Sequence, residues 1–205
     1  MEVIFTDTLT TDLSVIEKNC WERLLTGALR ADDPMHNAVV ANAGAANINM
    51  RTVVLRKAIP PAKQLSFYTD IRSGKWAELL QQNKISWLFY DAEARIQIRT
   101  GSTATLHQMD ELADKAWEET RLGNRKNYLS NLSPSAEIAN PLIGLPSVLP
   151  DNFTKEESEA GRKNFGVVIC TIDWIEWLWL GEHGHRRANF VYGADRTFAA
   201  NWLVP

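Results

Sequence analysis

Short segments rich in β-branched and aromatic residues, separated by turns, most strongly constrain how this chain can fold. Eight of them occur in 205 residues, at 36–41, 48–57, 64–69, 85–90, 95–106, 166–180, 184–192 and 197–203. Helix-like segments are inserted between some of them, but strand and helix do not alternate regularly, and no Gly-x-Gly-x-x-Gly motif occurs. This order argues against a doubly wound dinucleotide-binding fold. We expect an α+β protein built on an antiparallel barrel with flanking helices.

The remaining segments predict helices and one long connection. Apolar residues at three- and four-residue spacings predict helices over 14–30, 76–82 and 108–130, with Ser73 as an N-cap and Asn83 closing the second. Thr154 and Glu157 have the spacing of a capping box, which opens another short helix. The stretch 133–152 holds four prolines and is expected to be an irregular lid or binding loop. We expect one domain over 1–205, with a helical and irregular insertion at about 108–165.

Composition narrows the classes of function. No window is apolar enough to cross a membrane, and the first residues lack the features of a secretory signal, so we expect a cytoplasmic protein with no membrane partner. A net charge of −3 gives no general attraction to nucleic acid. Cys20 and Cys170 are far apart and should be buried apolar groups. His183 and His185 lack further ligands nearby, so no metal site is expected.

One region reverses the acidic trend. Between 51 and 75 a single acid, Asp70, accompanies six cations, namely Arg51, Arg56, Lys57, Lys63, Arg72 and Lys75. A solvated surface of scattered charge is one explanation. The other is an anion site, because strand alternation directs Arg51 and Arg56 to opposite faces of one strand, where they can flank a ligand.

The loop 69–75 favours the anion site. It supplies hydroxyls at Thr69 and Ser73, cations at Arg72 and Lys75, and the N-terminus of the helix that follows. Free backbone N–H groups at a helix N-terminus bind phosphate well. Ordinary capping by Ser73, with both cations solvated, is the alternative. The two basic segments are expected to meet on consecutive strands of one sheet.

The C-terminal strands carry a second group of cations. In 172–180, Trp174, Glu176 and Leu178 share one face of a strand, and tryptophans share the other, so this strand is central or lies at an interface. These tryptophans are expected to be core residues more than a ligand platform. The segment 185–187 (His-Arg-Arg) is expected to form a second anion clamp.

In this order, the segments resemble the pyridoxamine 5′-phosphate oxidase family, the FMN-binding split barrel with Greek-key character. The motifs that carry the resemblance are Arg51-Thr-Val-Val-Leu-Arg56, Phe67-Tyr-Thr69 with Ser73-Gly-Lys75, and Ile175-Glu-Trp177 with His185-Arg-Arg187. The resemblance implies FMN as the cofactor and a homodimer with shared sites. It assigns the FMN contacts to Arg51, Val54, Leu55, Arg56, Tyr68, Thr69, Ser73, Lys75, Gln97 and Arg187. It assigns the substrate anion to Arg121, His185 and Arg186, together with Arg56.

Several positions depart from the family pattern. Gln97 is displaced by one residue and needs a bulge to face the cofactor, and Gly74 replaces a common phosphate-binding arginine. Trp117 replaces the tyrosine of the substrate-phosphate pocket, and Asn124 or Arg125 stands where a serine is expected. An arginine that precedes the His-x-Arg triplet is also absent.

Two functions follow, and a third is the alternative to both. The first is an FMN-dependent oxidoreductase that takes a small anionic substrate, with pyridoxamine or pyridoxine 5′-phosphate oxidation by O2 as the specific reaction and no protein side chain identified as a general base. The second is a flavin- or haem-binding carrier or stress-related sensor without this activity. The third, an interaction module with an empty barrel, would make the basic residues coincidental.

Overall fold

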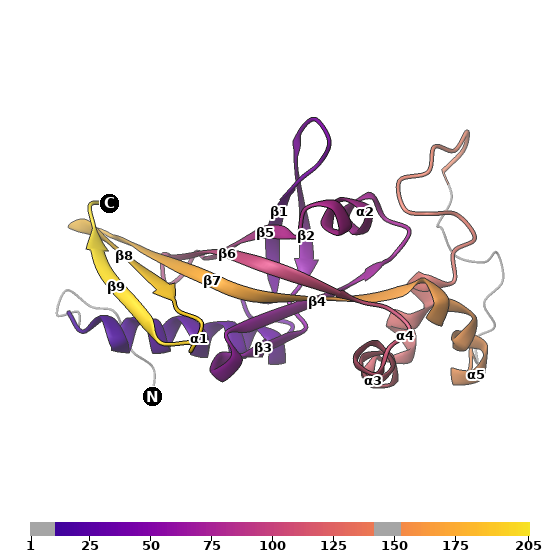
Figure 1. Cartoon of the computed structure of the whole chain (residues 1–205), viewed down its shortest axis with the longest axis horizontal. Helices are drawn as coiled ribbons and strands as arrows, with labels where there is room; N and C mark the ends of the chain where they lie inside the picture. The colour runs from indigo at the N-terminus through magenta and orange to yellow at the C-terminus, as the bar shows by residue number, and fades with distance from the viewer. Residues whose placement is uncertain (1–10, 142–152) are drawn as a thin grey trace.

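A computed structural model describes residues 11–141 and 153–205. Its nine strands form a single antiparallel sheet that curves along the long axis of the molecule (Figure 1). The strands are β1 (Asn37–Ala43), β2 (Ile48–Val54), β3 (Lys57–Ile59), β4 (Gln64–Asp70), β5 (Lys84–Asp91), β6 (Ile96–His107), β7 (Phe165–Gly181), β8 (Gly184–Tyr192) and β9 (Phe198–Leu203). The helices are α1 (Leu13–Leu29), α2 (Gly74–Gln81), α3 (Glu111–Glu119), α4 (Leu122–Arg125) and α5 (Lys155–Ser158), with 3₁₀ turns at Pro60–Ala62, Lys126–Tyr128 and Glu159–Asn164.

The strand order is β2-β1-β5-β6-β7-β4-β3, with β8 and β9 added beside β7. β2 and β4 are therefore not hydrogen-bonded neighbours along the sheet. They meet because the sheet curls, and the Arg56 N–H just after β2 donates to the Ser66 carbonyl in β4 at 2.8 Å. The expected α+β split barrel is confirmed. The expectation that the basic segments lie on consecutive strands was wrong, since β1, β5, β6 and β7 separate them along the sheet.

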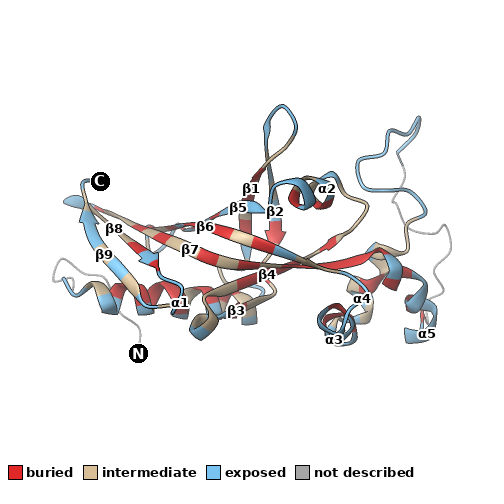
Figure 2. Cartoon of the chain, viewed as in Figure 1, coloured by how far each residue is buried: buried red, intermediate tan, exposed pale blue. Residues whose placement is uncertain are grey.

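Alternation along the strands builds the core. β5 alternates strictly, with Ile85, Trp87 and Phe89 inside and its other residues largely outside. Along β7, too, buried segments alternate with half-buried ones (Figure 2). The apolar face of α1 covers the same core through Ile16 and Leu24, which are fully buried. Both cysteines are buried and free, as expected.

A buried polar network holds α1 against the barrel. The Tyr192 hydroxyl donates to the Glu17 carboxylate at 2.7 Å and accepts from the Trp21 indole N–H at 2.8 Å. The Lys63 ammonium donates to the same carboxylate at 2.6 Å. The buried charges are paired and hydrogen-bonded, so this contact fixes the helix without leaving an uncompensated ion.

Several expected elements have different ends in the structure. The segment 48–57 divides into β2 and β3 where Leu55 and Arg56 bond across to other strands. The expected helix 108–130 stops at Glu119, because Thr120 is extended and its hydroxyl bonds back to the Ala116 carbonyl. Gln82, rather than Asn83, caps α2.

The long connection is only partly described. The capping box at Thr154 is confirmed, and residues 133–141 are turns and coil. Residues 142–152 of the expected loop lie outside the described residues. In the described ranges, no helix has the length and apolarity needed to cross a bilayer.

Candidate functional site

Four of the expected phosphate-binding residues converge at the N-terminus of α2. The Lys75 ammonium donates to the Thr69 hydroxyl, and the Thr69 and Ser73 oxygens lie 3.3 Å apart. Arg51 reaches this region from the inward face of β2, and its guanidinium lies 3.5 Å from Glu78 one turn further along α2. We call Arg51, Thr69, Ser73 and Lys75 the cradle.

The cradle holds two cations in a partly dehydrated setting. Burial and the neighbouring Arg51 charge lower the pKa of Lys75 to about 8. Desolvation disfavours an isolated charged amine, and a like charge nearby adds to this. A dianion placed between the two side chains would reverse both effects, so the cradle has the electrostatics of a phosphate site.

The backbone contributes donors at the same place. Ser73 stands at the N-cap of α2 in an extended conformation, as expected, but its side chain makes no capping hydrogen bond. Its hydroxyl is directed instead to Thr69. The first N–H groups of α2 therefore keep the capacity to bind an anion.

Close packing fixes the position of α2. Trp76 follows Lys75 and is buried against β7. A Cβ at Gly166 would lie 2.5 Å from the Trp76 ring, so this approach requires glycine. The helix N-terminus is thus held by the core and not by the loop alone.

Sequence reasoning missed three residues that organise the cradle. Glu78 accepts hydrogen bonds from the Asn42 amide at 2.7 Å and the Asn49 amide at 2.6 Å, besides its ion pair with Arg51. The Asn42 carbonyl oxygen in turn accepts from Arg51. Glu78 lies three residues after Lys75, so the two side chains are neighbours on the surface of α2. This spacing was the one sequence signal that could have placed Glu78 beside the cradle.

The expected flavin-lining residues lie at the seam between β2 and β4. Leu55 is fully buried, while Val54 and Arg56 are partly exposed. The Arg56 guanidinium lies over the Tyr68 ring at 5.5 Å. The cradle and this apolar, partly open seam are formed by the ends of the same two strands.

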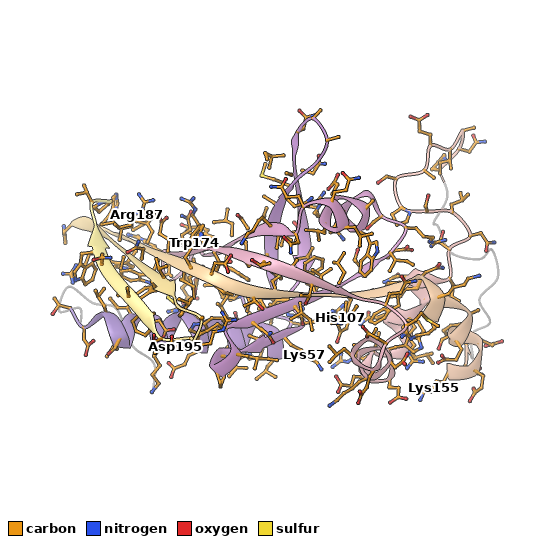
Figure 3. The ribbon with its side chains drawn as sticks, in the orientation of Figure 1. Lys57, His107, Lys155, Trp174, Arg187 and Asp195 are labelled. Atoms are coloured by element: carbon orange, nitrogen blue, oxygen red, sulfur yellow. The ribbon has the colours of Figure 1, made fainter. Side chains whose placement is uncertain are left out.

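Gln97 and Arg187 lie elsewhere. They occupy the outer face of β6 and β8, and both stand beside Leu178 of β7. Arg187 donates to Glu176 at 2.8 Å, and Arg99 pairs with the same carboxylate at 3.2 Å. Figure 3 places Arg187 at the β8 end of the long axis, away from Lys57, which directly follows the β2–β4 seam. One chain therefore does not bring all the expected FMN contacts together.

The bulge expected to turn Gln97 does not occur there. The register shift of β6 falls between Gly101 and Ser102, and Gln97 stays in regular pairing with Tyr90. His185 is exposed on the outer face, and Arg186 is half-buried opposite Trp179.

The expected substrate segment is built mainly into the fold. Trp117 is buried, and its indole N–H donates to Glu159 at 3.0 Å. Arg125 is 1% exposed, donates to the Trp117 carbonyl and Glu159, and stacks on the Trp117 ring at 4.6 Å. Arg121, in contrast to Trp117 and Arg125, is exposed, at the start of α4.

Part of the chain matches a known family of domains. Residues 18–108, which include the whole cradle and Gln97, match the model of the pyridoxamine 5′-phosphate oxidase FMN-binding domain. None of the curated proteins compared with the chain matches it.

Two solved structures share the fold over nearly the whole chain. One is a pyridoxamine 5′-phosphate oxidase-related, FMN-binding protein from Nostoc punctiforme PCC 73102, with a TM-score of 0.71 and 19% identity over 97% of this chain and 100% of that one. The other is PhzG from Burkholderia lata 383 in complex with tetrahydrophenazine-1-carboxylic acid. It has a TM-score of 0.67 and 17% identity, over 100% of this chain and 99% of that one. Over residues 18–108 the chain is thus similar to the FMN-binding domains of the pyridoxamine 5′-phosphate oxidase family, and the chain as a whole has the fold of these two proteins.

Proposed function

We propose that the chain binds FMN through the cradle and works as an FMN-dependent oxidoreductase. The observation that carries the proposal is the convergence of Arg51 with a partly buried Lys75, whose ammonium donates to Thr69 and whose pKa is lowered to about 8. Two cations, two hydroxyls and a helix N-terminus match the charge and the acceptor oxygens of a phosphate monoester.

The seam beyond the cradle fits the rest of the cofactor. The Val54 side chain offers an apolar surface, the neighbouring Leu55 can contribute only its backbone because its side chain is in the core, and Arg56 and Tyr68 add a polar edge. An aromatic ring system with polar edges requires this combination. FMN, when bound, supplies the redox chemistry, while the chain binds and orients it.

Arg56 is the residue we assign to the substrate anion on this chain. Its guanidinium lies over Tyr68 at the open end of the seam. Arg121 is exposed, and we propose that it contributes at longer range. Oxidation of pyridoxamine or pyridoxine 5′-phosphate remains the specific reaction to test, with O2 as acceptor.

A second candidate is a flavin-binding carrier or sensor without this reaction. One observation favours it: the polar groups of Trp117 and Arg125 already form hydrogen bonds within the fold, and both side chains are buried. An arginine that already donates to carbonyls and a carboxylate has little capacity left for a substrate phosphate.

We further propose a homodimer with shared sites. The outer sheet face exposes several apolar side chains, namely Ile48, Met50, Leu88, Tyr90 and Val191. Apolar side chains exposed on one face of a sheet are available for burial against a second copy. The Arg187 Nε is buried without a hydrogen bond in the described structure, and a ligand held by a second copy would supply the missing acceptor.

Reconstitution separates these possibilities. The purified chain is expected to bind FMN with a shifted flavin absorption spectrum and to release it on denaturation. Incubation with pyridoxamine 5′-phosphate under air, with aldehyde and peroxide measured, then distinguishes oxidase from carrier. A chain that binds no FMN would overturn the proposal, whereas binding without turnover would favour the second candidate.

A further inference from the structure

A groove separate from the cradle lies between α3 and the outer face of the sheet. Its floor is formed by β3, β4 and β7, and its roof by α3. It encloses about 230 Å³, which is less than the volume of a typical drug-sized site. Its size therefore suits a ligand of roughly ten non-hydrogen atoms.

The groove is apolar along its length and open to solvent on one side. Val167 and Ile169 of β7 line one wall. Ile59 and Leu112 also line it and are 44% and 50% exposed. Large apolar side chains exposed on both floor and roof favour an apolar occupant.

Polar groups are placed at defined points of this apolar surface. The hydroxyls of Ser66 and Tyr68 line the groove, and neither makes a hydrogen bond to any residue that the structure describes. Lys57 is paired with Glu119 at 2.6 Å. Lys115 also lines the groove and forms no ion pair within the described ranges, and its charge helps to lower the pKa of Glu119, so an occupant would share this cation with that carboxylate.

The roof is attached firmly on one side only. Ala113, Ala116 and Trp117 pack α3 against Phe165 and Val167. On the opposite side, the ion pair between Lys57 and Glu119 is about half-exposed, and such a pair contributes roughly 0–1 kcal/mol. The groove can therefore open towards β3 at little cost.

We propose that this groove binds a small amphipathic carboxylate, with its apolar part between Ile59 and Leu112 and its carboxylate at Lys115 and the two hydroxyls. The site goes beyond the proposed flavin function and uses different residues from the cradle. It adjoins the seam through Tyr68, so an occupant would lie beside the flavin site without filling it.

Octanoate is the probe, and octanamide is its neutral control of the same length. Calorimetric titration of the protein, with and without FMN, should show one saturable octanoate site per chain. Octanamide should bind several-fold more weakly. Lys115→Ala should weaken octanoate binding about threefold to tenfold, while Lys18→Ala, which removes an exposed cation of α1, should leave it unchanged.

Two substitutions test the place of binding. Ser66→Leu fills the floor and should abolish the site, with the fold checked by circular dichroism. Leu112→Asp puts a carboxylate at the exposed mouth and should weaken octanoate at least tenfold, whereas Leu112→Asn should weaken it less. If the Ser66→Leu protein does not fold, the comparison of octanoate binding by Leu112→Asp and Leu112→Asn tests the place of binding instead.

Absence of saturable octanoate binding, or binding unchanged in Lys115→Ala and Leu112→Asp, would overturn the proposal. Displacement of octanoate by FMN would also overturn it, because the probe would then occupy the flavin site. FMN binding is measured on the same samples. A protein that binds FMN but not octanoate would overturn the groove proposal and leave the flavin proposal intact.

Discussion

Arg51 and Lys75 approach each other from β2 and α2, and the arginine charge helps to lower the pKa of the lysine. The two residues are 24 positions apart in sequence and belong to elements that the sheet brings together only when it curls. The fold therefore creates an unfavourable pairing of like charges that an anion relieves.

FMN affinity should depend on pH through Lys75. The phosphate is a dianion above about pH 6, so it does not titrate in the relevant range. Lys75 loses its proton as pH rises through about 8, and FMN affinity should fall over the same range. Lys75→Arg stays charged and should show a flatter profile in fluorescence titrations between about pH 7 and 10. Identical profiles for both proteins would contradict the role of Lys75.

The contribution of Lys75 to the stability of the ligand-free protein should change with pH in the direction opposite to FMN affinity. The folded pKa of Lys75 is about 8 and the ordinary value is 10.5, so the unfolded chain binds more protons between these values. The contribution of Lys75 to the free energy of unfolding should therefore rise across that window. Lys75→Met should be more stable than wild type below pH 8, and the difference should shrink towards pH 10.5, as measured by urea denaturation. A difference that grows with pH would contradict the burial of a charged Lys75.

Arg125 should matter for stability and not for FMN. Its guanidinium is buried and donates to the carbonyls of Trp117 and Thr120 and to the Glu159 carboxylate. Arg125→Ala should lower the free energy of unfolding by about 3 kcal/mol, because several acceptors lose their donor. Arg121→Ala, on an exposed side chain, should change it by less than about 0.5 kcal/mol. Folded Arg125→Ala protein that loses FMN would show that this arginine acts at the cofactor site.

The shared site can be tested by complementation. Arg51→Ala and Arg187→Ala should each weaken FMN binding when purified alone. Co-refolded as an equal mixture, they should regain about one quarter of the full sites, because half of the dimers then contain one unmodified site. No recovery, in a sample shown to be dimeric by light scattering, would mean that Arg51 and Arg187 do not serve one site.

The sequence predicts the strands well because residue alternation is a local property. Ile85, Trp87 and Phe89 indicate their buried face without knowledge of any partner strand. The approach of β2 to β4 was not predictable in this way, because the contact between Arg56 and Ser66 depends on closure of the sheet.

The candidate site likewise contains residues that local sequence patterns indicate and residues that only the tertiary fold brings together. The meeting of the cradle residues was predictable in part because a basic strand and the start of a helix at Ser73 can both be recognised from short local patterns. Glu78, Asn42 and Asn49 were missed because their importance comes from a three-way contact between β1, β2 and α2. Arg125 stands near the position where the family pattern has a serine, and the tertiary packing of α3, α4 and α5 uses its side chain.

The most direct test of the account compares FMN with riboflavin, which lacks the phosphate. In calorimetric titrations of the ligand-free protein, Arg51→Ala and Lys75→Ala should each weaken FMN by about 1.5–3 kcal/mol, roughly 10- to 150-fold. Riboflavin affinity should be almost unchanged in both variants, and Lys18→Ala should leave both ligands unaffected. Unchanged FMN affinity in both cradle variants, or an equal loss for riboflavin, would contradict the assignment of the phosphate to Arg51 and Lys75.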